Sequence, residues 1–226
     1  MPSSLELREV SKSYRNGDRS TEVLHDISLT VTPASITALL GRSGCGKTTL
    51  LHLAGAMDFP TAGEVLIDGK STAQLSDGQL TALRRTRIGF VFQFFQLLPT
   101  LTALENVELP LLLARTPNST ATALDRLRWV GLEDKATSLP YQLSGGQMQR
   151  VAIARALVSS PDILIADEPT GNLDTVSGDQ VLGLLQEAAV KFGATVLMAT
   201  HSAEAAAIAG ARVNLRDGRI TSIDRT

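Results

Sequence analysis

The chain has 226 residues, of which 43% are hydrophobic, and its net charge is −2. This length allows one large domain or two small ones, and the scattered positive charge argues against nucleic acid as an obligate partner. No apolar run approaches the roughly 18 residues that cross a membrane, and a single cysteine rules out an internal disulfide, as is common in a reducing cytosol.

Alternation of apolar and polar residues predicts strands over residues 5–10, 27–31 and 64–68. Asn16-Gly17 marks a turn between the first two, so we expect a small antiparallel sheet. Tyr14 lies between the first strand and this turn. We expect its ring either to stack on an adenine or to be ordinary half-buried packing.

A glycine-rich stretch follows a buried strand expected at 36–40 and precedes a helix expected at 49–54. It fits the P-loop pattern G-x-x-x-x-G-K-[ST], and its residues are Gly41, Arg42, Ser43, Gly44, Cys45, Gly46, Lys47, Thr48 and Thr49. The glycines allow successive backbone N–H groups to converge on an anion at the positive end of the helix. Lys47 is expected to reach the β- and γ-phosphates of a nucleotide, and the Thr48 hydroxyl to bind Mg²⁺.

A helix over 77–85 and a buried strand over 88–93 come next. We expect the basic side chains of Arg84, Arg85 and Arg87 to form a solvated helix end. Gln93 closes the strand, and the carboxyl end of a strand is where a parallel sheet presents polar groups to a ligand.

An apolar loop, residues 94–99, follows Gln93 directly. One interpretation is core packing. The other is a docking surface for a partner protein, because an apolar loop next to a ligand site is hard to shield from water.

Residues 102–157 are predicted to be mostly helical, starting with a capping box at Thr102. Pro110, Pro117 and Pro140 are expected to break the helices. The absence of a strand pattern over about 50 residues is unusual for a simple crossover between strands. We therefore expect a helical insertion between two strands of the core.

The segment Leu143-Ser144-Gly145-Gly146-Gln147 lies within this insertion. Ser144 is a good N-cap for a helix over 147–158, but a cap does not require two glycines. Glycines at a helix start leave N–H groups that can bind a second phosphate. Since one chain rarely needs two such sites for one nucleotide, we infer that this one faces a nucleotide held by another subunit.

Two carboxylates end the apolar strand expected at 163–168. Asp167 can hold Mg²⁺ through water, and Glu168 can orient and activate an attacking water. After a P-loop, this pair favours an enzyme that hydrolyses nucleotides.

A helix over 176–192, a strand over 195–199 and a hairpin over 212–223 complete the expected elements. His201 follows the strand, at the sheet edge expected for Gln93 and Glu168. It is either a structural histidine or part of the catalytic group.

These residues, in this order, resemble the ATP-binding subunits of ABC transporters, and Leu143–Gln147 matches the signature sequence of that family, which small-molecule kinases with a P-loop lack. The resemblance implies a single ABC ATPase domain over residues 1–226. Its fold would be α/β, with a mostly parallel P-loop core, an antiparallel N-terminal β subdomain and a helical subdomain over about 94–158.

The resemblance also implies a role for each site residue. The catalytic residues would be Lys47, Gln93, Glu168 and His201, and the Mg²⁺ ligands Thr48, Gln93 and Asp167. ATP would be bound by Tyr14, Gly41, Arg42, Ser43, Gly44, Cys45, Gly46, Lys47, Thr48 and Thr49 and, from the opposite subunit, by Ser144, Gly145, Gly146 and Gln147.

Residues 92–99, 102–107 and 169–174 look most like the group of ATPases that serve lipoprotein release, macrolide efflux and cell division. This implies a homodimer around two ATP molecules, bound to an integral membrane permease at the cytoplasmic face of the membrane. Two alternatives remain at this point: mechanical signalling to an extracytoplasmic partner without solute transport, and a soluble ABC ATPase of DNA repair or translation. The latter usually has two ATPase halves or a long coiled-coil insertion.

Overall fold

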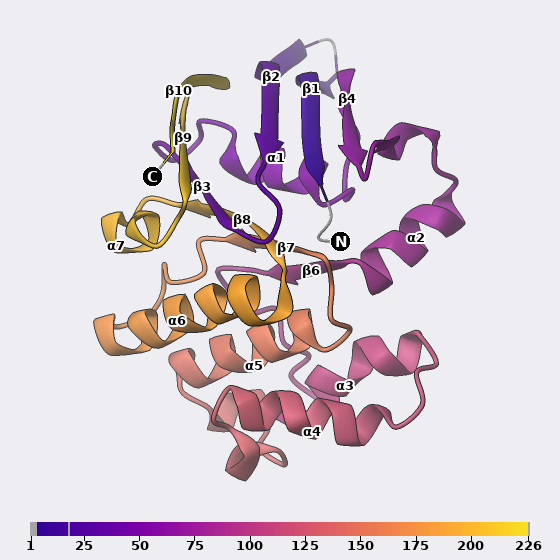
Figure 1. The fold of residues 1–226 in the computed structure, drawn as a ribbon, viewed down its shortest axis with the longest axis vertical. Helices are drawn as coiled ribbons and strands as arrows, with labels where there is room; N and C mark the ends of the chain where they lie inside the picture. The colour runs from indigo at the N-terminus through magenta and orange to yellow at the C-terminus, as the bar shows by residue number, and fades with distance from the viewer. Residues whose placement is uncertain (1–3, 18, 226) are drawn as a thin grey trace.

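The computed structural model describes residues 4–17 and 19–225, and its elements form two sheets flanked by helices (Figure 1). The strands are β1 Leu5–Asn16, β2 Arg19–Val31, β3 Ile36–Leu40, β4 Ala62–Ile67, β5 Lys70–Ser71, β6 Ile88–Val91, β7 Ile163–Asp167, β8 Thr195–Thr200, β9 Ala211–Arg216 and β10 Arg219–Arg225. The α-helices are α1 Lys47–Ala54, α2 Asp77–Thr86, α3 Ala103–Leu113, α4 Ser119–Trp129, α5 Gly145–Leu157, α6 Thr175–Phe192 and α7 Ala203–Ala207. Short 3₁₀ turns occupy Thr72–Gln74, Glu133–Lys135 and Pro140–Gln142.

The larger sheet has six strands in the order β10-β9-β3-β8-β7-β6, and all neighbours are parallel except β10 and β9. Its central strands are buried on both faces, as parallel strands usually are. Leu39, Ile165 and Leu197 pack on the side of α1, whereas Leu164 and Val196 pack on the side of α6. Because β3, β8, β7 and β6 are adjacent and parallel, the segments that follow them meet at one edge of the sheet.

The smaller sheet is antiparallel, in the order β2-β1-β4-β5, and lies above the larger one in Figure 1. Leu5 pairs with Val31 on one side and with Ile67 on the other. All three side chains are buried in the same core as α1. The mixed α/β fold with an antiparallel N-terminal sheet is therefore confirmed.

Helices α3, α4 and α5 pack around a hydrophobic cluster of their own, at the bottom of Figure 1. Val107, Leu127 and Val151 form its centre, one from each helix, and none of them is exposed. Helix α5 leads back into β7, so the helices are inserted between β6 and β7 of the six-stranded sheet.

Pro110 does not break a helix, contrary to the sequence prediction, because it lies inside α3. A proline there removes one hydrogen bond to the preceding turn. Val107 and Leu111 on either side of it are buried in the helical cluster, and this packing offsets the lost bond.

The predicted strand over 88–93 and the predicted solvated arginines also need correction. Strand β6 ends at Val91, and Phe92 O accepts a hydrogen bond from Phe95 N as the chain turns. Arg87 is not a free helix end, since it bridges Asp162 and Asp68, with both ion pairs at 2.6 Å.

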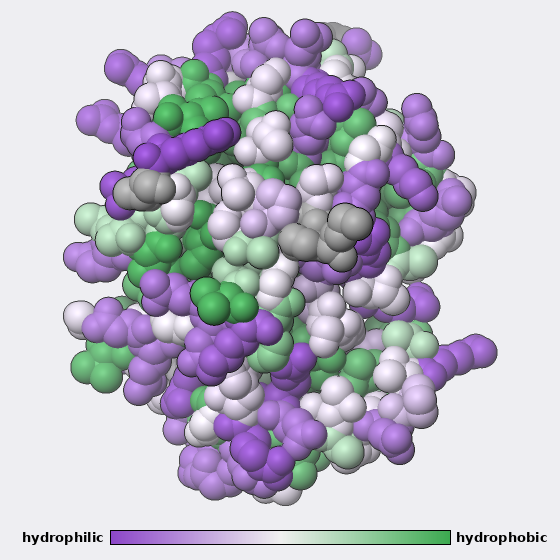
Figure 2. Space-filling model, in the orientation of Figure 1, coloured by the Kyte–Doolittle hydropathy of each residue, from purple (hydrophilic) through white to green (hydrophobic). Residues whose placement is uncertain are grey.

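In the described part of the chain, no helix is long and apolar enough to cross a membrane. On the face drawn in Figure 2, apolar residues form small patches separated by hydrophilic side chains.

Candidate functional site

The loop between β3 and α1 is the first part of the site, and we call residues Gly41–Thr48 the glycine loop. Gly46 is the N-cap of α1, with φ of +105° and no side-chain cap, so the first N–H groups of the helix are left to a ligand. The buried Lys47 side chain donates hydrogen bonds from Nζ to the carbonyl oxygens of Gly41, at 2.7 Å, and Arg42, at 3.2 Å. The ammonium group thus lies across the mouth of the loop.

Asp167 ends β7 and faces the glycine loop. The Thr48 hydroxyl donates a hydrogen bond to Asp167 Oδ2 at 2.9 Å. Burial raises the pKa of the Asp167 carboxyl, and the hydrogen bond from Thr48 partly offsets this. A partly buried carboxylate beside a hydroxyl is suited to a divalent cation, which would lower its pKa again.

Glu168 and His201 form a pair at the ends of β7 and β8. His201 Nδ1 lies 2.9 Å from Glu168 Oε2, and the backbone N–H of His201 is 3.3 Å from the same oxygen. Glu168 adopts a left-handed backbone with φ of +46°, which is uncommon for a residue with a side chain. Its side chain is largely buried, whereas that of His201 is mostly exposed.

Gln93 lies two residues beyond β6, and its amide is next to Gly171, where an added Cβ would be 3.1 Å from Gln93 Nε2. A buried glutamine of α5 connects the segment after β6 to the segment that follows Glu168. Gln149 Nε2 donates to Pro169 O at 2.7 Å and to Phe92 O at 3.3 Å. The sequence reasoning missed Gln149, and its only signal was a polar residue at an apolar position of a helix.

These groups surround one cavity of about 690 Å³, which is lined by Val23, Arg42, Ser43, Gly44, Gly46, Lys47, Thr48, Thr49, Gln93, Asp167, Glu168 and His201. Apart from Val23, every lining residue was singled out from the sequence. Val23 belongs to β2 of the smaller sheet, and an apolar residue within a strand gave no sign that it faces a ligand.

Three predicted binding residues of the N-terminal part, Gly41, Cys45 and Tyr14, do not line this cavity. Gly41 takes part only through its carbonyl oxygen, which accepts the hydrogen bond from Lys47. The Cys45 thiol is buried in the hydrophobic core under α1, because its side chain points to the opposite side of the loop from Lys47, so only its backbone can serve the site. Tyr14 is half-exposed but does not line the cavity. Its hydroxyl donates to Asp58 at 3.0 Å, and the Lys12 ammonium lies 4.9 Å from its ring centre.

Residues Ser144–Gln147 also lie outside this cavity. Ser144 is the N-cap of α5, and a complete capping box links its side chain and backbone to Gln147. The predicted cap is therefore present. Phe95 and Leu173 are near Gly145, each 3.7 Å from an added Cβ.

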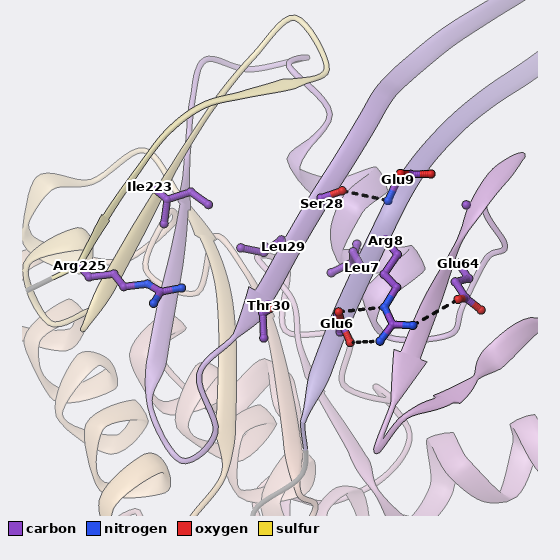
Figure 3. Close-up of a pocket in the computed structure, with 11 residues that line it drawn as sticks. Glu6, Leu7, Arg8, Glu9, Ser28, Leu29, Thr30, Glu64, Ile223 and Arg225 are labelled. Carbon is purple, nitrogen blue, oxygen red and sulfur yellow. Dashed lines mark hydrogen bonds and ion pairs between the residues drawn. The ribbon is translucent and has the colours of Figure 1, made fainter.

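A second cavity, of about 750 Å³, lies on the outer face of the antiparallel sheet (Figure 3). Three of its charged side chains form ion pairs: Arg8 pairs with Glu6 at 2.8 Å and with Glu64 at 3.7 Å. Nothing in it corresponds to a loop that binds an anion, so the smaller cavity at the sheet edge is the candidate active site.

A glycine loop at a helix start, a buried lysine and a hydroxyl–carboxylate pair at the carboxyl edge of a parallel sheet define a P-loop nucleotide-binding protein. Comparison with known proteins identifies the family. Residues 24–171 match the ABC transporter family. The chain therefore belongs to the ABC transporter family, and it is an ATP-binding and ATP-hydrolysing member of it.

Relatives and solved structures agree with this assignment. The chain is 47% identical over 224 residues to the lipoprotein-releasing system ATP-binding protein LolD of Geobacter metallireducens, covering 98% of this chain and 100% of the relative. It is 45% identical to LolD of Shewanella denitrificans, covering 95% and 93%. Two solved dimeric structures of an ATP-binding cassette, one in a post-hydrolysis state with ADP and Pi, each have a TM-score of 0.90, with 40% and 41% identity over 98% of both chains.

Proposed function

We propose that this chain is the ATPase subunit of a lipoprotein-releasing system, working as a homodimer beneath an integral membrane permease at the cytoplasmic face of the membrane. The relatives with this name match the chain over nearly its whole length, which favours this function over mechanical signalling or a soluble ABC ATPase. Residues 1–226 would form one ABC ATPase domain, with residues 94–158 as its helical subdomain.

Each residue at this edge of the sheet would have a different role in ATP hydrolysis. Lys47 and the N–H groups of the glycine loop hold the β- and γ-phosphates, exchanging the carbonyl partners of Lys47 for phosphate oxygens. Glu168 accepts a hydrogen bond from the attacking water and polarises it. His201 holds the Glu168 carboxylate in place through Nδ1, 2.9 Å away.

The chemistry of the donor groups fits Mg²⁺. A hydroxyl, a carboxylate and an amide oxygen are available from Thr48, Asp167 and Gln93. No group of three acidic, histidine or cysteine side chains able to hold a metal exists in the described residues. Substrate phosphates would supply much of the coordination of Mg²⁺. The bound ion would neutralise charge that develops on the phosphates.

The observation that most strongly supports a dimer is that the starts of α1 and α5 lie apart within one chain. The glycine loop lines the active-site cavity, whereas Ser144–Gln147 does not. The proposed role of Ser144, Gly145, Gly146 and Gln147 is to contact the γ-phosphate held by the other subunit. Relatives of known structure that form dimers support this arrangement.

A groove of about 500 Å³ between the six-stranded sheet and the inserted helices is the proposed dock for the permease. Its lining includes the apolar residues Phe92, Leu109 and Leu113 and two basic residues, Arg84 and Arg85, which we call its basic rim. Phe92 is next to Gln93, so a segment seated here would sense the active site. The basic rim favours an acidic cytoplasmic segment of the permease.

The apolar loop 94–99, for which core packing and docking were both considered, is partly packed and partly exposed, and we propose its exposed part as a second contact of the permease. Phe94 and Leu98 are 67% and 43% exposed, whereas Phe95 is half-buried against the start of α5. Arg155 fixes the loop by donating to the carbonyl oxygens of Phe95 and Gln96. Exposed apolar residues on a fixed loop are suited to contact a partner.

Co-purification with the co-expressed permease of the lipoprotein-releasing system tests this proposal. Leu98→Glu and Leu113→Glu should abolish co-purification with the co-expressed permease and leave the basal ATPase activity of the isolated subunit within twofold. Val190→Glu is the matched control, since Val190 is an exposed apolar residue on α6 and its substitution should change neither. Normal co-purification of both the loop variant, Leu98→Glu, and the groove variant, Leu113→Glu, would rule out this dock.

A further inference from the structure

The turn between β9 and β10 touches the glycine loop from the side opposite the active-site cavity. The backbone N–H of Gly218, in this turn, donates a hydrogen bond to Cys45 O at 3.1 Å. The carbonyl oxygen of Gly218 accepts one from His25 N at 2.9 Å. Gly218 therefore joins the glycine loop to β2, although the three segments are far apart in the sequence.

The hydrogen bond to Cys45 fixes a whole peptide plane. In a trans peptide the C=O of one residue and the N–H of the next point in opposite directions. A donor that holds Cys45 O on the Gly218 side consequently turns the N–H of Gly46 to the other side. Gly46 lines the active-site cavity, and Cys45 does not. The direction of this N–H is what an anion site at a helix start depends on.

Gly218 has no space for a side chain. Its φ is +72°, and an added Cβ would collide with Val23 O and lie 2.7 Å from Cδ2 of His25. The same part of β2 supports the glycine loop, because a Cβ added to Gly46 would be 2.7 Å from Leu24 Cδ2. A displacement at Gly218 is thus passed to Gly46 by two routes, directly through Cys45 and through β2.

We propose that Gly218 is a positioning residue for ATP binding, which holds the glycine loop in the conformation that directs the Gly46 N–H toward phosphate. This inference rests on the proposed role of the glycine loop in holding phosphate. The residue acts through Cys45 and touches no substrate atom.

Gly218→Ala tests the proposal, with Gly69→Ala as its matched control. Gly69, in the turn between β4 and β5, has nearly the same φ, +73°, but nothing lies within 4 Å of an added Cβ. Both variants carry the cost of a left-handed alanine, and only Gly218→Ala disturbs the glycine loop. We expect KM for ATP to rise about tenfold, with kcat within twofold, because ground-state and transition-state binding of phosphate weaken together. Gly69→Ala should change neither.

The only cysteine of the chain provides a second readout. Cys45 is 7% exposed, and a loosened glycine loop would uncover its thiol. At a temperature well below the melting transitions of both variants, maleimide should label Gly218→Ala at least about tenfold faster than Gly69→Ala. Equal KM values and equal labelling rates in the two variants would overturn the proposal.

If Gly218→Ala fails to fold, hydrogen exchange in the unmodified protein tests the same proposal. On titration with Mg-ATP, hydrogen exchange at the Gly218 amide should slow in parallel with that at Gly46, and exchange at Gly69 should not change. Exchange at Gly218 that ignores ATP while Gly46 responds would refute the role of Gly218. No response at Gly46 would instead refute phosphate binding by the loop.

Discussion

Helices α1 and α5 both have glycine at the helix start, as the N-cap of α1 and as the first residue of α5, and they differ in how that start is capped. Helix α1 begins after Gly46 with no side-chain cap, and its first residues line a cavity together with a histidine and two carboxylates at the ends of neighbouring strands. Helix α5 begins after Ser144, which forms a capping box with Gln147, and it lies outside that cavity. The start of α1 is completed by other elements of the same chain, whereas the start of α5 is closed by its own cap, and we propose that its ligand is held by the other subunit. A site built from both requires two copies of the chain.

Lys47→Ala should produce the largest effect, because it removes the charge beside the phosphates from the start of α1. We expect kcat/KM for ATP to fall about 10²- to 10³-fold, the scale for the loss of one donor that stabilises developing charge. Steady-state phosphate release measures this. Lys191→Ala, on the exposed side of α6, is the control. A Lys47→Ala variant with more than a tenth of the normal activity would contradict the phosphate role.

Glu168→Gln should separate binding from hydrolysis. The amide keeps the shape of the side chain but cannot take up a proton from water, so kcat should fall about 10²-fold or more. Removal of a negative charge beside the γ-phosphate also favours the ATP-bound state. Light scattering during size exclusion should show an ATP-dependent dimer in this variant and a weaker shift in the wild type.

Glu204→Gln, which changes an exposed carboxylate hydrogen-bonded to Ser202, should leave hydrolysis unchanged. Near-normal hydrolysis by Glu168→Gln would assign water activation to other residues, with His201 and Gln93 the nearest candidates.

Asp167→Asn should stabilise the nucleotide-free protein while impairing Mg-ATP binding. Burial raises the pKa of Asp167 above its ordinary value of 3.8, so ionisation of the carboxyl opposes folding at any pH above that raised value. The variant should therefore melt about 2 °C higher than the wild type at pH 7. The difference should shrink as the pH falls through the raised pKa and protonates the wild-type carboxyl.

Thermal melts from pH 7 to pH 4.5 check the sign of this difference in melting temperature. Asp134→Asn, which changes an exposed carboxylate, is the control. A variant less stable than the wild type at every pH would show that the interactions of the Asp167 carboxylate outweigh its burial.

Cys45→Ala should have the smallest effect on activity. Since the thiol is buried in the core and turned away from the cavity, KM for ATP should stay within twofold of normal. The lost packing should lower the melting temperature by about 2 °C. A tenfold rise in KM with unchanged stability would place the thiol in the phosphate site.

The residues that meet at this edge of the sheet were predictable from the sequence because they lie at or shortly after the ends of apolar strands, and parallel strands bring their carboxyl ends together. The sequence also predicted the Ser144 cap, whose partner is only three residues away. The direction of the Cys45 side chain was not predictable, since it depends on backbone angles within the loop. Val23 and Gln149 contribute through contacts between distant elements, and no local pattern marks such contacts. The helix through Pro110 likewise depends on tertiary packing.

The composite site is tested most directly by a purified heterodimer, with different affinity tags, of one Lys47→Ala subunit and one Ser144→Arg subunit. If Ser144 acts on the nucleotide of the other subunit, both lesions fall in one site and the second site is intact. We predict that this heterodimer traps one ATP and regains part of the activity that both mutant homodimers lack. A heterodimer that traps no ATP and is as inactive as the homodimers would show that Lys47 and Ser144 serve the same subunit, and would contradict the account.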